Sequence, residues 1–339
     1  MKNTGMAKYI SLIPGLLLFF CLTGCKKTQY DLLDPSTAGK WTLINSQNSL
    51  LPGNSIYGLT RDKNNNMWAA CYGNGVAKYQ NGVWTAYSTS NSYILSNYTT
   101  SVATTSSGDI FIGTEVGLSE LSAAGTWYYY KDATVPYMCI NTIKVASDGA
   151  LWIGTLNQGY YYYGGSGFQH YLSGYTVNAV AQDGSGNVWL GTNSGLYKYT
   201  GTHFTSASIP YLTASGGLPK NKITALFVDS KGRIWIGYYY GKTVSYLSGS
   251  TINQVSLMDG SDSTIVWAIS EDKKGDIWFA TDSYGLIRYD GVVPHSYKTY
   301  NYPNDIKENY FASICNDKDG NIWFGMYTKG ILKYTLPLE

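Results

Sequence analysis

The feature that most constrains this chain is a short phrase that returns seven times, at intervals of about forty residues. Each copy is a polar turn followed by an aliphatic–aromatic–aliphatic strand, as in Lys231–Gly237 (KGRIWIG) and Asp319–Gly325 (DGNIWFG). The central aromatic residues lie 37 to 46 residues apart; they are Trp68, Phe111, Trp152, Trp189, Trp235, Trp278 and Trp323. A repeat of this length is typical of one four-stranded propeller blade.

Within one repeat, the pattern predicts short strands separated by turns. Ile223–Asp229 is rich in β-forming residues, Arg233–Gly237 reads as the second strand, and Thr243–Leu247 reads as the third. No stretch after the first 25 residues shows a sustained helical period. We therefore expect an all-β chain, a seven-bladed β-propeller with four-stranded blades. The repeated aromatic residue should be buried between blades, and the glycine after it should allow close backbone approach.

The two ends of the repeat array indicate how the ring closes. The last repeat ends at Ile331–Tyr334 without a fourth strand. Near the other end, Trp41–Ile56 aligns without gaps to Trp84–Thr99, which is the fourth strand of the first repeat with its outgoing loop. We therefore expect the N-terminal strand to complete the last blade, which removes an unpaired edge that would invite aggregation.

The first residues have the features of an export signal. A basic head precedes Ile10–Leu22, an apolar run of 13 residues that is too short to span a membrane. Leu22–Cys25 (LTGC) has the form of a lipoprotein signal-peptidase site, so we expect cleavage before Cys25 and lipid, palmitate included, on its sulfur. Lys26 follows this cysteine in place of aspartate, which by analogy favours the outer membrane, on either its periplasmic or its surface side.

These features divide the chain into three parts: a lipoprotein signal peptide (1–24), a lipidated cysteine with a polar tether (25–38), and the propeller (39–339). The chain has 24 basic and 22 acidic residues, and two of the basic ones, Lys2 and Lys8, lie in the signal. The remainder is electrically balanced, and its scattered charges provide no basic surface for nucleic acid. We expect a monomer that reaches the membrane through its lipid.

The repeat also resembles a known family. Leu218–Gly237 (LPKNKITALFVDSKGRIWIG) looks like the two-component-regulator propeller repeat, and the resemblance covers about residues 41–335. In that family the repeats form the periplasmic sensor part of hybrid histidine kinases, often linked to polysaccharide use, and they also occur in free-standing envelope proteins. Since the sequence ends after the propeller repeats, we expect a form that lacks the kinase, the membrane helix and the extra β-domain of the sensor proteins. The resemblance therefore implies a free-standing lipoprotein form without the kinase.

Few residues predict catalytic chemistry. His170, His203 and His295 fall in or before different outer strands, so no histidine dyad or metal site follows. The turn Asp317–Asn321 resembles the start of a calcium loop, but its twelfth position is Thr328 where a bidentate glutamate is required, which favours a hairpin turn. Some seven-bladed propellers are streptogramin lyases that use paired histidines and a glutamate around a metal. The scattered histidines of this chain do not favour such a site. We expect no catalytic residue, no metal and no cofactor here.

Tyrosine is the outstanding compositional excess, with 33 in 339 residues. In a propeller, the loops that join second to third strands ring the central channel on the face that also carries the loops between blades. From these loops we predict a ligand site formed by Tyr72, Glu115, Asn157, Asn193, Tyr239, Asp282, Tyr284 and Tyr327. Flat amphipathic rings with amides and carboxylates suit a sugar or a peptide. A wet polar face without a specific ligand is the alternative.

The leading hypothesis is a non-enzymatic module of the cell envelope that binds a glycan or peptide. The alternative is a structural or assembly protein that docks other envelope or secretion proteins, for which an exposed apolar patch would be the sign. A weaker alternative is a lyase or hydrolase.

Overall fold

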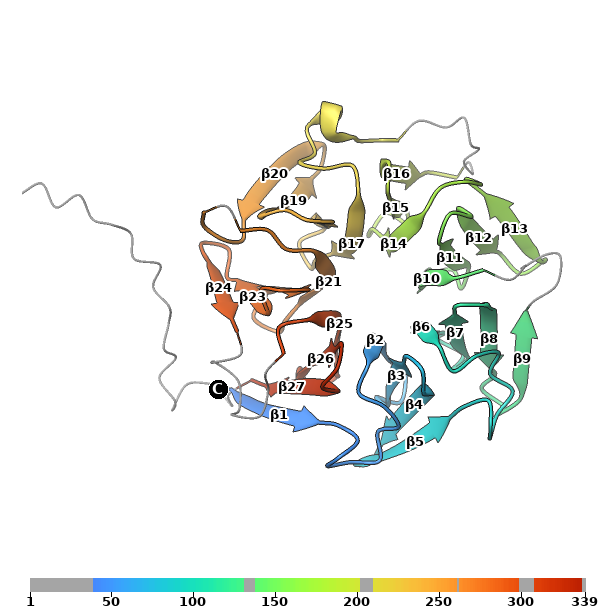
Figure 1. The fold of residues 1–339 in the computed structure, drawn as a ribbon. Coiled ribbons are helices and arrows are strands. Elements are labelled where there is room, and N and C mark those ends of the chain that lie inside the picture. The colour runs from blue at the N-terminus through green and yellow to red at the C-terminus, as the bar shows by residue number, and fades with distance from the viewer. Residues whose placement is uncertain (1–38, 131–137, 202–209, 261, 299–307, 337–339) are drawn as a thin grey trace, which may run out of the picture. The chain divides into compact units, whose positions relative to one another are not determined.

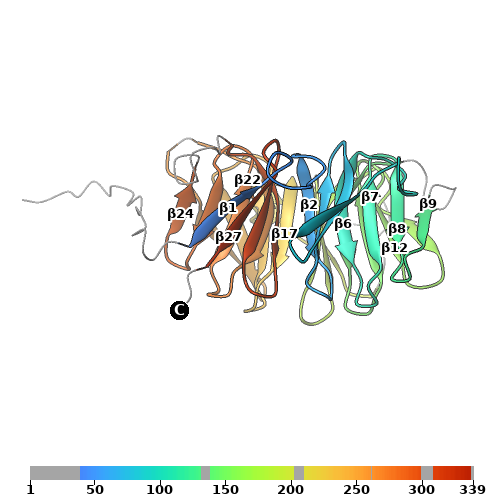
Figure 2. The ribbon, with the colours of Figure 1, turned by 90° about the horizontal axis from the view of Figure 1, so that it is seen from below.

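The computed structural model describes residues 39–130, 138–201, 210–260, 262–298 and 308–336. These residues form seven antiparallel sheets arranged around a common centre as the blades of a propeller (Figure 1). The predicted all-β, seven-bladed fold is therefore confirmed. Figure 2 shows the strands running between the two faces of the ring, where the loops gather. The predicted signal peptide, lipidated cysteine and tether (1–38) lie outside the described residues.

Six blades follow one another in sequence, each counted outward from the channel, and a seventh joins the two ends of the array. Blade 1 consists of β2 (Ile56–Arg61), β3 (Met67–Cys71), β4 (Gly75–Gln80) and β5 (Val83–Tyr87). Blade 2 consists of β6 (Thr99–Thr104), β7 (Ile110–Thr114), β8 (Gly117–Leu121) and β9 (Trp127–Tyr130). Blade 3 consists of β10 (Ile140–Val145), β11 (Leu151–Thr155), β12 (Tyr160–Tyr163) and β13 (Phe168–Tyr171). Blade 4 consists of β14 (Val177–Gln182), β15 (Val188–Thr192) and β16 (Gly195–Tyr199). Blade 5 consists of β17 (Ile223–Val228), β18 (Ile234–Tyr238), β19 (Thr243–Ser248) and β20 (Thr251–Ser256). Blade 6 consists of β21 (Val266–Glu271), β22 (Ile277–Thr281), β23 (Leu286–Tyr289) and β24 (Pro294–Tyr297). Residues 202–209, which follow β16, lie outside the described part of blade 4, and a short 3-10 helix, η1 (Ala214–Gly216), precedes blade 5.

Blade 7 closes the ring with both ends of the array. It consists of β25 (Phe311–Asn316), β26 (Ile322–Met326), β27 (Ile331–Thr335) and β1 (Lys40–Ile44), and β1 lies at its outer edge (Figure 1). The register places Trp41 opposite Tyr334 and Ile44 opposite Ile331, so the predicted pairing is confirmed. The Trp41 ring lies 4.4 Å from that of Tyr334 and 6.0 Å from that of Phe324, measured between centroids.

The hydrophobic core is divided among the junctions between blades. Seven clusters of buried side chains are present, and each joins residues of two neighbouring blades. Every second strand is buried along its whole length, as the sequence predicted. A Cβ at Gly237 would lie 2.8 Å from the Val266 side chain of the next blade, so the glycine after the aromatic residue does permit the close approach.

An acid at the first turn of five blades holds the blade tryptophan in place. The indole Nε1 of Trp235 donates to Asp229 Oδ2 at 2.7 Å, and the carboxylate also accepts backbone N–H groups of the turn. The same bond joins Asp62 to Trp68, Asp183 to Trp189, Asp272 to Trp278 and Asp317 to Trp323, at 2.8 to 3.1 Å. The sequence assigned these acids to hairpin turns only. The structure shows that they also satisfy a buried indole.

Two findings bear on broader classes of function. Among the described residues, no helix is long and apolar enough to cross a membrane. In the same part of the chain, no group of three or more histidine, cysteine, aspartate or glutamate side chains could hold a metal ion.

Candidate functional site

The residue that follows each second strand is placed at the channel mouth by a repeated backbone hydrogen bond. Its N–H donates to the carbonyl just ahead of the innermost strand in all seven blades, for example from Tyr72 to Ser55 at 2.8 Å and from Tyr327 to Tyr310 at 3.1 Å. Six of the eight predicted site residues occupy this position: Tyr72, Glu115, Asn193, Tyr239, Asp282 and Tyr327. In blade 3 the position is held by Leu156. The repeat therefore assembles these six residues into one ring.

Asn157 and Tyr284 lie further along their loops and have other partners. The Asn157 carboxamide oxygen accepts a hydrogen bond from the Thr176 hydroxyl at 2.7 Å, which ties this loop to the start of blade 4. The Tyr284 ring packs against the core cluster between blades 5 and 6, and its hydroxyl donates to Asp262 at 3.1 Å. The Lys298 ammonium lies 3.4 Å from the centre of the same ring. These contacts place both residues outside the ring described above.

A continuous run of aromatic side chains borders the mouth over blades 6, 7 and 1. We call it the aromatic run; in order it contains Trp267, Tyr310, Tyr327, Tyr57, Tyr72 and Tyr98. Neighbouring ring centroids lie 4.6 to 6.2 Å apart, and three of the five contacts are stacked. Since each inner member has a ring on both sides, the run presents ring edges and hydroxyl groups more than open faces.

Four members of the aromatic run were missed by the sequence reasoning: Tyr57, Tyr98, Trp267 and Tyr310. Tyr57 and Trp267 are the second residues of innermost strands, where a register shift marks a β-bulge in all seven blades. A bulge re-aims a side chain, which strict alternation along a strand cannot reveal. The available signal was the composition of this position, since the seven repeats place Tyr57, Thr100, Asn141, Asn178, Thr224, Trp267 and Ala312 there.

Three phenols of the run, those of Tyr57, Tyr72 and Tyr310, have pKa values raised above the ordinary value. The hydroxyl of Tyr72 donates to Glu115 Oε1, and this bond raises the pKa of Tyr72 to about 12. Burial raises the pKa of Tyr57 well above its ordinary value of 10.0, and a hydrogen bond between the hydroxyls of Tyr57 and Tyr327 raises it further. Burial also raises the pKa of Tyr310 to about 12. At neutral pH these groups are therefore uncharged and can both donate and accept hydrogen bonds.

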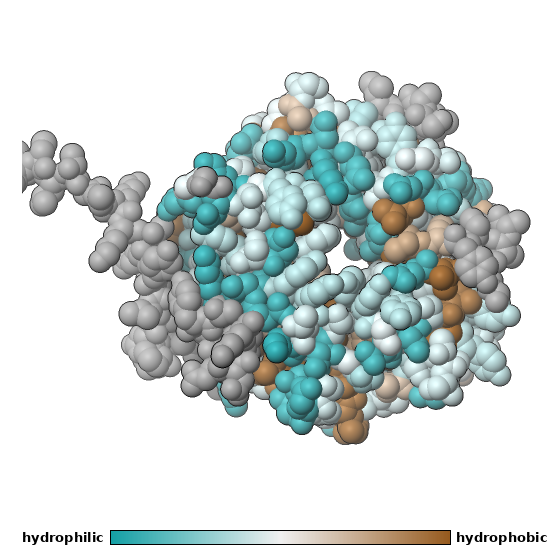
Figure 3. All heavy atoms as spheres, in the orientation of Figure 1, coloured by the Kyte–Doolittle hydropathy of each residue, from teal (hydrophilic) through white to brown (hydrophobic). Residues whose placement is uncertain are grey.

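The other side of the mouth, over blades 2 to 5, is polar and braced between blades. The bulge side chains of Thr100, Asn141, Asn178 and Thr224 each donate to a carbonyl at the start of the next innermost strand. For Asn178 the acceptor is Ile223, at 2.8 Å, and the same amide nitrogen donates to Asn193 Oδ1 at 3.0 Å. These bonds fix the spacing of the blades around the channel. Figure 3 shows an opening at the centre of the ring that is bordered mainly by hydrophilic and near-neutral residues.

The two histidines that the structure describes lie on different blades and do not converge. His170 lies on β13 and His295 on β24, the outermost strands of blades 3 and 6, and His203 lies outside the described residues. His295 is paired with Asp290 of its own hairpin, at 2.8 Å.

Five stretches of the chain match the family model described as two component regulator propeller. They are residues 50–73, 171–194, 217–240, 260–283 and 305–328. The chain therefore carries repeats of this type in blades 1, 4, 5, 6 and 7, each match spanning the loop into a blade and its first two strands. The same five blades contain the Asp–Trp hydrogen bond, whereas the first two strands of blades 2 and 3 lie outside the matched stretches.

Solved structures share the fold at low sequence identity. The extracellular domain of a protein described as a hybrid two component system from B. thetaiotaomicron has a TM-score of 0.69 and 20% identity, and the match covers 88% of this chain but only 42% of that one. Virginiamycin B lyase from Staphylococcus aureus, solved with quinupristin, has a TM-score of 0.69 and 17% identity over 88% of this chain and 99% of the lyase. YCF48 bound to D1 peptide has a TM-score of 0.63 and 14% identity, with coverage of 88% and 97%. No curated protein sequence matches the chain.

Proposed function

We propose that this protein is a non-enzymatic ligand-binding propeller of the cell envelope, and that it holds a glycan or a peptide at the channel mouth. The observation that carries the proposal is the aromatic run, six adjoining rings over three blades, next to the carboxylates of Glu115 and Asp282 at the same mouth. Preformed concave sites with a few oriented polar groups are the usual form of ligand sites in proteins.

The chemistry of the mouth favours a neutral ligand rich in hydroxyl or carbonyl groups. The phenols of Tyr57, Tyr72 and Tyr310 stay protonated, so their oxygens are uncharged and can accept hydrogen bonds from the hydroxyl or amide groups of such a ligand. Ring edges add apolar contact area at a small cost in side-chain entropy, because packing against neighbouring rings already restricts them. Both features suit a sugar or a peptide backbone better than an anion.

The envelope location rests on Leu22–Cys25, which has the form of a lipoprotein processing site. We infer that Cys25 carries lipid and that residues 26–38 tether the propeller to the outer membrane. The repeats resemble those of sensor domains, and in this chain we assign them to ligand binding in a lipoprotein.

A glycan array and a peptide library, each probed with the purified protein, will identify the ligand class. Tyr327→Ala and Tyr239→Ala should then each weaken binding about tenfold, roughly 1.4 kcal/mol. Tyr327 is 38% exposed, so its loss should leave the melting temperature near that of the unchanged protein.

Tyr284→Ala is the matched control, since it removes the same side chain from the same face of the ring. Because Tyr284 packs on the core cluster between blades 5 and 6, its loss should lower the melting temperature without changing affinity. A ligand that ignores Tyr327→Ala and Tyr239→Ala, or that responds equally to Tyr284→Ala, would contradict the site. Turnover of a bound ligand that depends on added metal would instead indicate an enzyme.

A further inference from the structure

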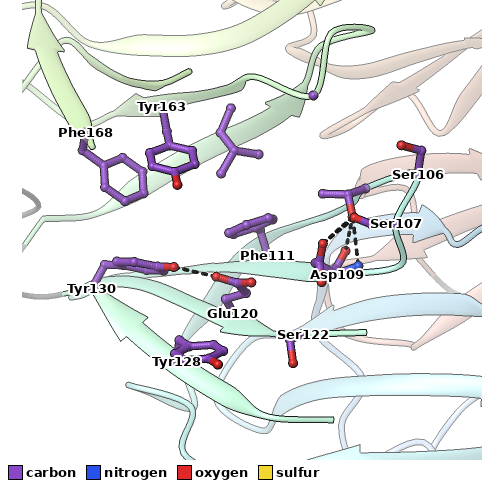
Figure 4. Close-up of a pocket in the computed structure, with 13 residues that line it drawn as sticks. Ser106, Ser107, Asp109, Phe111, Glu120, Ser122, Tyr128, Tyr130, Tyr163 and Phe168 are labelled. Carbon is purple, nitrogen blue, oxygen red and sulfur yellow. Dashed lines mark hydrogen bonds between the residues drawn. The ribbon is translucent and has the colours of Figure 1, made fainter. Parts of the chain in front are cut away.

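A groove of about 510 Å³ lies between blades 2 and 3, away from the channel mouth. We call it the 2–3 groove. Its walls are formed by aromatic side chains from both blades and by the turn between β6 and β7 (Figure 4). Phe111, Tyr128 and Tyr130 belong to blade 2, and Tyr163 and Phe168 belong to blade 3. Figure 4 shows Phe111 between the Glu120–Tyr130 pair and the two rings of blade 3.

Near the equivalent place in five other blades the protein supplies its own cation, whereas blade 3 has Tyr162 opposite Trp152. The third-strand residue opposite the blade tryptophan is Lys78 in blade 1, Lys198 in blade 4 and Lys333 in blade 7. Their ammonium groups lie 4.9 to 5.8 Å from the tryptophan ring centres, a distance at which a cation is attracted to a ring face. In blade 5 the opposite residue is Tyr246, and the guanidinium of Arg233, from the preceding turn, lies 5.1 Å from the Trp235 ring centre. Blade 6 has Arg288 opposite its tryptophan.

Blade 2 reverses this charge. The residue opposite its aromatic ring, Phe111, is Glu120. The ring is also smaller than tryptophan, and Thr105 stands where five other blades have the acid that anchors the indole. Because Phe111 is smaller than tryptophan and lacks an anchoring acid, and because an acid replaces the cation, space is left for the 2–3 groove. Its walls are aromatic and include a carboxylate, and none of the described residues that line it is lysine or arginine.

The carboxylates of the groove accept hydrogen bonds from uncharged donors. Glu120 Oε2 accepts a hydrogen bond from the Tyr130 hydroxyl at 2.6 Å, and no ion pair with Glu120 is present in the described part of the chain. Asp109 accepts hydrogen bonds from the Ser107 hydroxyl and the Ala123 N–H, and these lower the pKa of Asp109 below its ordinary value. Lys63 of blade 1 reaches this turn, where its ammonium donates to the Ser107 carbonyl.

We propose that the 2–3 groove binds an organic cation, a primary ammonium or guanidinium group, over Phe111 and against Glu120. The ligand thereby supplies the charge that lysine or arginine supplies in blades 1, 4, 5 and 7. Such a group occurs on lysine and arginine side chains of peptides and on polyamines, and both sources share this chemistry. The aromatic walls favour the methylene stem that carries the charge.

Ligand-observed NMR by saturation transfer tests the proposal on the full chain. The probes are n-butylammonium and n-butylguanidinium, with n-butanol as the neutral comparison. We expect both cations to bind with dissociation constants on the order of 1 mM, and butanol to bind at least tenfold more weakly. A tripeptide with one lysine, blocked at both ends, and putrescine then separate the two sources, since the true class should bind more tightly than butylammonium. No transfer to either cation, or equal transfer to butanol, would overturn the proposal.

Two substitutions at one position sharpen the test. Glu120→Gln keeps an oxygen that can accept from Tyr130 but removes the charge, so cation binding should fall at least tenfold. Glu120→Lys installs the residue type of blades 1, 4 and 7; it should abolish binding while the melting temperature stays equal or rises. Asp259, an exposed acid of the loop before blade 6, provides matched controls as Asp259→Asn and Asp259→Lys, which should leave binding unchanged. Retained affinity in Glu120→Gln, or a folded Glu120→Lys that still binds, would refute the assignment.

Discussion

The Asp–Trp bond of blade 5 should be worth several kcal/mol, and Asp229→Ala measures it. Asp229 Oδ2 accepts from Trp235 Nε1 at 2.7 Å and from Arg233 Nε at 2.5 Å. Its Oδ1 accepts the backbone N–H groups of Lys231 and Arg233 at 3.0 and 2.8 Å. Alanine therefore removes four donor–acceptor contacts at once, and it leaves the indole of Trp235, which has no exposed surface, without an acceptor.

The magnitude follows from which donors can reach water afterwards. The Trp235 N–H stays buried, and an unsatisfied buried donor costs about 1–3 kcal/mol. The Arg233 side chain is 18% exposed and can be partly resolvated, so the loss of its bond to Asp229 costs less. Together with the two backbone bonds to a charged acceptor, we expect Asp229→Ala to lower the free energy of unfolding by about 3–5 kcal/mol.

Urea denaturation followed by tryptophan fluorescence and by circular dichroism provides the measurement, and the two transitions should coincide if unfolding is two-state. A double-mutant cycle with Trp235→Phe isolates the indole bond, for which we expect a coupling of about 1.5–3 kcal/mol. Asp259→Ala, at an exposed acid, should change stability by less than about 0.5 kcal/mol. A loss below about 1 kcal/mol in Asp229→Ala, or a coupling near zero, would show that these acids serve the turn alone.

Three further outcomes are expected. Trp41→Ala should lower stability by about 3–5 kcal/mol, because it removes a large ring packed on blade 7 and leaves a cavity; a melting temperature unchanged by it would contradict the role of β1 in closure. Acid should destabilise the fold through the carboxyls of Asp62, Asp183 and Asp229: burial raises their folded-state pKa, but hydrogen bonds lower it more strongly, to below the ordinary value of 3.8. Their contribution to stability is complete above pH 3.8 and is lost as the pH falls through the folded-state pKa. Equal urea midpoints at about pH 6 and about pH 3 would count against this prediction. Cys25→Ser should yield a soluble or unprocessed protein in membrane fractionation, and wild-type migration and fractionation would exclude the lipoprotein assignment.

The repeat pattern alone was sufficient to predict the architecture. Seven copies of one phrase specify seven equivalent blades, because each blade can bury its aromatic residue only against a neighbour. The gapless match of Trp41–Ile56 to the outgoing part of the first repeat also predicted the register of closure, which places Trp41 opposite Tyr334. Local sequence determines these features because strand pairing follows hydrophobic alternation and turn position.

The candidate site was predictable only where a residue's place follows from its number within the repeat. Tyr72, Glu115 and Tyr327 come directly after a second strand, and a backbone bond puts that position at the mouth in every blade. Tyr284 comes two residues later in its loop, and its packing on the core of the neighbouring junction could not be read from spacing.

Tertiary structure alone decided which side chains from different blades meet. Tyr57 and Trp267 join the aromatic run because a bulge in the innermost strand redirects them, and a bulge depends on pairing with the second strand. The 2–3 groove likewise arises from two substitutions, Phe111 and Glu120, whose meaning appears only when the register places them opposite each other. A sequence repeat specifies positions within a blade, whereas contacts across blades depend on the packing that closes the ring.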